Sequence, residues 1–330
     1  MDQALHFDEF DPVSRQQWLE RIHAELKNAS PGNTRWQYEA DLSIDPFVHA
    51  EDPLATRSFV PRTGPWQCGD TFTVDGDATS VNQDVLEALA GGIDAVHLRV
   101  RQVPDWDRLL RDIALDMIHL TIDLHTADPD QDAELFLSWL DGRGIPYQDD
   151  ALTIRGCTKT HTPYAQTIMI PAKAGVIEGL VQALTAAAVT SGATEFCVDI
   201  GPHYFVEIAR LRALRILYHN LGQALNRPAD TIIETRVAES VLQPDIDQNL
   251  IRAGSIALSA ILGGADRIYT SVVPEGQPPS SFHRRMARNI HHLFRYESHL
   301  ESLTDPVSGA YYLEKLTRQI VEKVWERLAG

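Results

Sequence analysis

The stretch Glu195-Phe196-Cys197-Val198-Asp199-Ile200 is a short apolar run, and it is followed by a long helical pattern over Tyr204–Leu225 and a second apolar run at Thr231–Thr235. Within the helical segment, Ile208, Leu211 and Leu214 recur at the spacing that places side chains on one face of a helix. A strand, a helix and a strand in this order predict one β-α-β unit with parallel strands.

The same alternation continues on both sides of this unit. Further strands are expected at 66–74, 95–100, 119–124, 167–170 and 265–272, with a short eighth strand near Ser302–Leu303. Helices are expected over 82–90, 128–143, 175–191, 247–262 and 280–296. Strands joined by crossover helices over this length favour the α/β class and a closed (β/α)8 TIM barrel. The alternative, an open doubly wound sheet, usually has a Gly-rich phosphate loop after its first strand, whereas residues 75–80 are D-G-D-A-T-S.

Residues 1–65 have a different pattern and are expected to form an extended N-terminal arm. Ser14 can cap a helix that runs to about Lys27 and carries Trp18, Leu19, Ile22 and Leu26 on one face. Four prolines, at 46, 53, 61 and 65, follow in an irregular stretch. The sequence therefore predicts an interaction segment at 1–65 and a barrel at 66–330.

Charge and cysteine content exclude several functions. The 330 residues carry a net charge of -17, which repels nucleic acid and anionic membranes. The three cysteines are widely separated, so they predict neither a zinc site nor a disulfide framework. The start Met1-Asp2-Gln3 has no apolar segment typical of a signal peptide, and a cytoplasmic protein is expected.

Four ordered blocks in the C-terminal part carry a family resemblance. They are His203–Ala213 (H-Y-F-V-E-I-A-R-L-R-A), Asn249–Gly264 with A-L-S-A-I-L-G-G, Arg288–Leu300 with R-N-I and E-S-H-L, and Asp305–Thr317 (D-P-V-S-G-A-Y-Y-L-E-K-L-T). Together they resemble the barrel of the methylmalonyl-CoA mutase family. The N-terminal arm, with Trp18, Leu26, Trp36 and Pro46-Phe47, is most similar to the family's small (beta) subunit.

The resemblance implies a cobalamin-dependent isomerase that moves groups within a CoA thioester. Active members need a cobalamin domain with a D-x-H-x-x-G loop, a barrel His and Tyr, an Arg for the substrate carboxylate, and polar residues that thread pantetheine along the barrel axis. No such cobalamin loop follows the barrel pattern here, so no cobalamin-binding domain and no cofactor are expected in this chain. The segment Asp123–Asp128 (D-L-H-T-A-D) lacks the glycine, and we interpret it as a chance match.

The barrel positions of the family's functional residues also differ. The segment that matches the catalytic G-Y-H-M-Q-E-A-G string is Ile168–Gly175, which contains no His. Ala193-Thr194-Glu195 stands where the family has a CoA-contacting R-L-S, an exchange expected to repel phosphate. The first strand continues as Gln67–Phe72 without the Arg and Tyr of T-I-R-Q-Y-A-G, and the loop near Thr231–Glu239 has no His.

Some polar residues nevertheless fall at expected strand ends, where barrels place their sites. The weak catalytic candidates are Asp123, His125, Asp199 and His203, with His97 nearby. One hypothesis is a new pocket built from them; the other, which we favour, is a polar plug in a barrel that holds no substrate.

Three functions stay open from the sequence. The leading hypothesis is a catalytically inactive small subunit, a pseudoenzyme whose partner is a methylmalonyl-CoA mutase large subunit or a second copy of itself, with adenosylcobalamin on the partner. The first alternative is a catalytic barrel that acts on a CoA thioester with a cobalamin-binding chain supplied in trans. The second is a stand-alone barrel with unrelated small-molecule chemistry.

Overall fold

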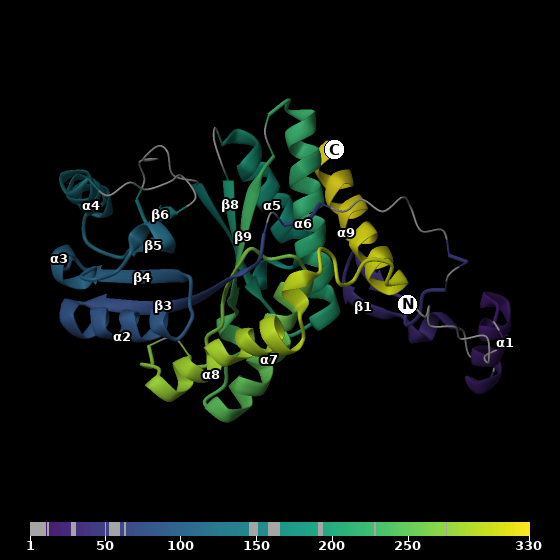
Figure 1. Ribbon diagram of the computed structural model, residues 1–330. Helices are drawn as coiled ribbons and strands as arrows, with labels where there is room; N and C mark the ends of the chain where they lie inside the picture. Colours follow the sequence, from purple (N-terminus) through teal and green to yellow (C-terminus); the bar gives the residue numbers. More distant parts are fainter. Residues whose placement is uncertain are drawn as a thin grey trace, which may run out of the picture.

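The computed structural model describes residues 11, 13–27, 31–49, 51–52, 60–62, 64–144, 151–157, 166–190, 194–227, 229–274 and 276–330. Its main sheet has eight parallel strands in the order β6-β5-β4-β3-β10-β9-β8-β7, curled into a nearly closed barrel (Figure 1). The strands are β3 (Gln67–Asp75), β4 (Ala95–Gln102), β5 (His119–Leu124), β6 (Leu152–Arg155), β7 (Gln166–Ile170), β8 (Thr194–Ile200), β9 (Thr231–Val237) and β10 (Arg267–Tyr269). The expected α/β class and TIM-like barrel are confirmed.

Helices alternate with these strands, as the sequence predicted. They are α2 (Ala78–Ala90), α3 (Trp106–Leu109), α4 (Pro129–Arg143), α5 (Val176–Val189), α6 (Tyr204–Ala224), α7 (Ile246–Leu262), α8 (Ser281–His292) and α9 (Tyr311–Ala329). Several begin at side-chain caps, because the first backbone N–H groups of a helix need an acceptor. Asp77 caps α2, Asp128 caps α4, Asp245 caps α7 and Ser280 caps α8.

The position of the eighth strand was predicted wrongly. Residues Leu300–Ser302 form a 3-10 turn, and the missing strand is β6, at Leu152–Arg155. This strand has four residues with polar Thr153 and Arg155 in it, so its apolar signal is too short to stand out from a loop. Residues 145–150 and 158–165, on either side of it, lie outside the described residues.

The apolar core lies between the sheet and its surrounding helices. Outward-facing strand residues such as Phe196, Val198 and Ile233 pack with α5, α6 and α9 in one cluster. A second cluster joins the outer faces of β3, β4 and β5 to α2 and α4. Because side chains alternate along a strand, the remaining strand residues point into the barrel, and many of them are polar.

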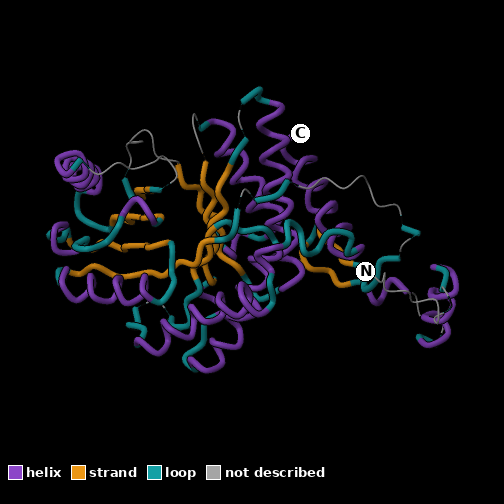
Figure 2. The backbone as a smooth tube through the Cα atoms, in the orientation of Figure 1, coloured by secondary structure: helices purple, strands orange, loops and turns teal. Residues whose placement is uncertain are grey.

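Part of the N-terminal arm packs on its own barrel. Strands β1 (Trp36–Glu39) and β2 (Leu42–Ile44) form an antiparallel hairpin, and Leu42 and Ile44 are 1% and 3% exposed within the core cluster. The Glu39 carboxylate accepts the backbone N–H of Val176, at 2.6 Å, and so caps α5, whose own N-cap is Gly175. The tube view shows this hairpin beside the C-terminal helices (Figure 2).

Helix α1 (Arg15–Glu25) is different, because none of its residues is buried. It stands away from the barrel at the end of the molecule opposite α3 and α4 (Figure 1). Trp18 stacks on Phe47 with ring centroids 4.6 Å apart. Among the described residues, no helix is both long and apolar enough to cross a membrane.

One buried histidine fastens α8 to the barrel. The Trp66 indole N–H donates to His291 Nδ1 at 3.2 Å, and the other ring nitrogen lies 2.8 Å from the Thr270 hydroxyl. Burial, together with the charge of Arg295, lowers the pKa of His291 to about 3. The ring is therefore neutral in the folded protein at neutral pH.

This histidine should make stability depend on pH. The unfolded ring has an ordinary pKa of 6.5, so the unfolded state binds the extra proton and stability falls as the pH drops from about 6.5 toward 3. We expect His291 to account for a loss of about 2 kcal/mol of unfolding free energy between pH 7 and pH 5. Urea unfolding of His291→Gln should show a pH dependence smaller by that amount, while His23→Gln, at an exposed position, should match the wild type. Equal pH dependence in all three proteins would contradict the assignment.

Candidate functional site

The barrel interior contains a buried ion network formed by Arg155, Glu195, Glu234 and Arg267. Arg155 donates to both oxygens of Glu234, at 2.9 and 2.8 Å, and to Glu195 Oε1 at 2.7 Å. Arg267 donates to the same Glu195 oxygen at 3.1 Å. The four residues are 8%, 1%, 0% and 2% exposed, respectively. Because β6 and β9 are not neighbours in the sheet, the Arg155–Glu234 pair crosses the inside of the barrel.

The Glu234 carboxyl of this network is ionised in the folded protein. Burial alone would raise the pKa of the Glu234 carboxyl, but the charge and hydrogen bonds of Arg155 hold that pKa well below its usual range. Thr153 donates to Glu195 at 2.9 Å, and the Cys197 thiol donates to Glu234 at 3.2 Å. Burial strongly raises the pKa of Cys197, so this thiol stays protonated. These contacts satisfy the buried carboxylates, as charges in an interior require.

This arrangement revises the role that the sequence suggested for the Glu195 carboxylate. The sequence suggested that this carboxylate would repel a phosphate, but two guanidinium groups already pair with it. Glu195 is thus one part of a buried set of paired charges and is not an unpaired negative charge. Ala193, which stands beside it in the same comparison, lies outside the described residues.

Asp123 and His125, two of the predicted candidates, do meet at the carboxyl ends of the strands. Asp123 Oδ2 is 3.1 Å from His125 Nε2 and 3.3 Å from His97 Nε2. Burial opposes ionisation, but the two histidines hold the pKa of Asp123 well below its usual range. A carboxylate can only accept, so each Nε2 carries a hydrogen. Burial lowers the pKa of His97, and its neutral ring then accepts from the Thr71 hydroxyl, 3.4 Å from Nδ1.

The other two candidates lie elsewhere. Asp199 on β8 pairs with Arg236 on β9 at 3.0 Å. His203 precedes α6 and contacts the arm, with its ring 5.2 Å from Trp36 and 5.0 Å from Tyr38. The four residues therefore do not form one constellation in this structure, and a catalytic role for any of them stays a prediction.

A cavity of ≈ 290 Å³ opens at the carboxyl ends of β3, β9 and β10. Its charged lining residues are Asp70, Arg99, Asp199, Arg236, Glu239 and Arg284. The Tyr269 ring also lines it and packs where Gly69 has no side chain; a Cβ at Gly69 would collide with that ring. The site is thus a polar pocket above a filled barrel.

The described residues of this chain offer no set of metal ligands. Within the ranges that the structure describes, no three His, Cys, Asp or Glu side chains are grouped so that they could hold a metal ion. The D-L-H-T-A-D segment runs from the end of β5 to the N-cap of α4 and has Asp128 where the cobalamin loop needs a glycine, so it does not fit that loop.

Sequence reasoning missed the Arg155, Glu234 and Arg267 network. The available signal was the period of two: Glu195-x-Cys197-x-Asp199 and Glu234-x-Arg236 place ionisable groups on one face of otherwise apolar strands. That pattern indicates polar residues inside the barrel. It does not show which carboxylate meets which guanidinium, because the partners come from different strands.

The fold and site define a (β/α)8 barrel whose axis is occupied by paired charges. Comparison with known proteins shows which family part of this barrel resembles. A model of the family described as "Methylmalonyl-CoA mutase" matches residues 175–330. Residues 175–330 of this chain are thus similar to the methylmalonyl-CoA mutase family, which is cobalamin-dependent.

The relatives include two kinds of protein. The methylmalonyl-CoA mutase of Cereibacter sphaeroides is 33% identical over 41% of this chain and 20% of its own length. The methylmalonyl-CoA mutase small subunit of Porphyromonas gingivalis is 25% identical over 97% of this chain and 63% of its own length. That of Propionibacterium freudenreichii subsp. shermanii is 27% identical over 82% and 51%, respectively. The chain therefore spans less than two thirds of each of these relatives.

Proposed function

We propose that this chain is a non-catalytic barrel subunit that supports a cobalamin-binding large subunit of the methylmalonyl-CoA mutase type. The observation that carries this proposal is the buried ion network of Arg155, Glu195, Glu234 and Arg267. An active barrel of this family needs an axial path for pantetheine, and here long charged side chains from β6, β8, β9 and β10 occupy the axis.

Energetics support exclusion of a thioester by this network. A pantetheine chain could enter only if the ion pairs separated inside the barrel. Breaking a buried pair typically costs about 3–5 kcal/mol, because a charge is left without compensation. That cost would be subtracted from the binding free energy and would weaken a micromolar site to the millimolar range or beyond. Similarity to small subunits over 97% and 82% of this chain supports the same role and a large-subunit partner.

Calorimetric titration tests the loss of substrate binding. Methylmalonyl-CoA added to the purified chain should give no saturable heat below about 1 mM, because the axis is closed and the family's substrate ligands are absent. Adenosylcobalamin should behave in the same way. A sub-millimolar dissociation constant for the acyl-CoA would overturn the proposal and favour the catalytic alternative, with cobalamin supplied in trans.

We further propose that α1 contacts the partner. Its apolar residues Trp18, Leu19 and Ile22 are only half-buried, and they border a groove of ≈ 280 Å³ that also includes Phe47 and Lys315. The barrel itself leaves this face uncovered, and exposed apolar surface of this kind marks interaction sites. The partner is the large subunit or a second copy of this chain.

A matched pair of arm variants tests this contact. Leu19→Ser/Ile22→Ser should reduce association with the large subunit in a pull-down, or self-association in light scattering, by at least about tenfold. The control, Gln16→Ser/His23→Ser, changes exposed residues of the same helix and should associate normally. Both variants should melt like the wild type. If the first variant melts far earlier while association is unchanged, the face belongs to the chain's own core.

A further inference from the structure

The pocket at the barrel mouth has charged and polar residues in its lining beside apolar ones such as Leu242 and Val273, and it is not used by the proposed supporting role. Its ≈ 290 Å³ volume approaches the size of small-molecule sites, and it lies at the strand ends where barrels bind ligands. The ion network and Tyr269 close the path below it. A ligand of this pocket must therefore be small and must bind without entering the axis.

Two guanidinium groups in the lining keep free donor capacity. Arg284 uses Nη1 for Asp70, at 2.8 Å, and for the Thr71 carbonyl, at 3.0 Å. Arg236 uses Nη2 for Asp199. An arginine has five N–H donors in a planar fork, so each retains donors suited to a carboxylate or phosphate oxygen.

Acceptors in the lining complement these donors. The Thr71 hydroxyl gives its hydrogen to His97, whose other ring nitrogen donates to Asp123, so the Thr71 oxygen can only accept from a ligand. Ser271 similarly donates to the Val273 carbonyl at 2.9 Å and retains its lone pairs. The charged lining residues balance, with three arginines against three carboxylates, so a ligand with a single negative charge and its own donors fits better than a polyanion.

From this complementarity we propose that the barrel mouth binds a small organic acid that carries one oxyanion and, a few atoms away, a hydroxyl or amino group. The oxyanion lies against Arg236 and Arg284, and the donor group lies against Thr71 and Ser271. Such a ligand matches both halves of the pocket. A coenzyme A thioester, by contrast, needs the closed axis.

Titration of the whole chain with matched probes tests this inference. Glycerate and serine, which combine an acid with a donor, should bind in the millimolar range or tighter, and the stronger of the two identifies a hydroxyl or an amino donor. Propionate, an acid with one carboxylate and no donor, and glycerol, which has donors but no acid, should bind at least about tenfold more weakly. Arg284→Gln and Arg236→Gln should each weaken the better probe by about tenfold or more.

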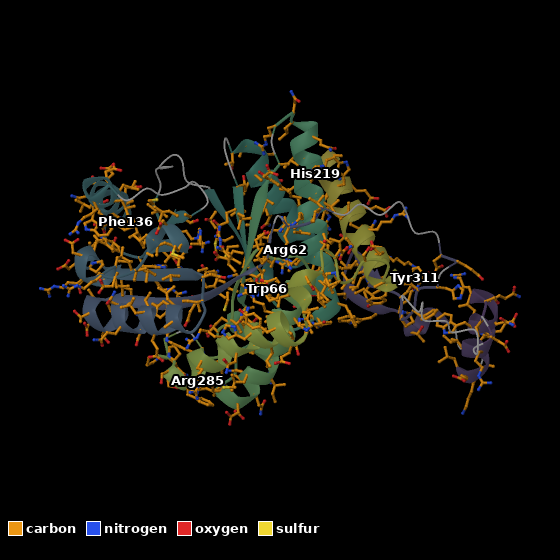
Figure 3. All side chains as sticks on the ribbon, viewed as in Figure 1. Arg62, Trp66, Phe136, His219, Arg285 and Tyr311 are labelled. Atoms are coloured by element: carbon orange, nitrogen blue, oxygen red, sulfur yellow. The ribbon has the colours of Figure 1, made fainter. Side chains whose placement is uncertain are left out.

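The control variant is Arg285→Gln. Arg285 is the next residue on α8, is exposed at the edge of the molecule (Figure 3), and does not line the cavity, so its loss should leave binding unchanged. If Arg284→Gln fails to fold, Arg236→Gln carries the test alone. Absence of saturable binding by both acids at about 10 mM, or equal binding by all the variants, would overturn the inference. Neither result would affect the proposed function, which the methylmalonyl-CoA titration and the association of the arm variants test separately.

Discussion

Replacing Arg155 with methionine should destabilise the protein by about 3–5 kcal/mol, since two buried carboxylates lose a shared partner. Glu234 would lose both of its short contacts, and its remaining cation, the Arg267 guanidinium, is 3.7 Å away. Glu195 would keep Arg267. Urea unfolding followed by circular dichroism at neutral pH measures the effect. Arg101→Met, at an exposed position on β4, is the control and should change stability by less than about 0.5 kcal/mol.

A double variant separates charge from packing. In Arg155→Met/Glu234→Gln, the unpaired carboxylate is gone and the Glu195–Arg267 pair stays balanced. We therefore expect the loss of stability in the double variant to be smaller than the sum of the two single losses, by a coupling energy of roughly 1–3 kcal/mol. If the effects of the two substitutions are simply additive, the residues do not act as one network. They would then not close the barrel axis as a unit.

Trp66→Ala should cost about 3–5 kcal/mol, the second large effect. Trp66 is fully buried, and its indole hydrogen bond to His291 joins β3 to α8. The Arg62 and Arg295 guanidinium groups lie 5.3 and 5.2 Å from its ring, and Arg62 and Trp66 are labelled together at the centre of Figure 3. Truncation therefore removes a large side chain and leaves polar partners unsatisfied.

The matched control for this substitution is Trp325→Ala. Trp325 lies on α9 and is 38% exposed, so truncation there should cost about 1 kcal/mol or less. Both variants can be compared by thermal and urea unfolding. A Trp66→Ala protein as stable as Trp325→Ala would mean that the Trp66–His291 contact does not fasten α8.

The sequence by itself determined the class of fold. Apolar runs such as Glu195–Ile200 alternate with helices at a spacing that only parallel strands with crossovers satisfy. Local chemistry also sufficed for helix starts, because caps such as Asp128 and Ser280 act within three residues of themselves. The short strand β6 was missed for the same reason, since four residues with two polar side chains carry little local signal.

Only the tertiary structure decided how the charges combine. Arg155 reaches Glu195 and Glu234 across 40 and 79 positions of sequence, and no periodicity specifies such a pair. The tertiary structure also decided which of the predicted catalytic candidates lie together. Asp123 and His125 meet at one strand end, whereas His203 contacts the arm hairpin. Residue spacing fixes which face of a strand a side chain occupies, but barrel closure determines which side chains meet across the axis, and those contacts decide whether the axis is open.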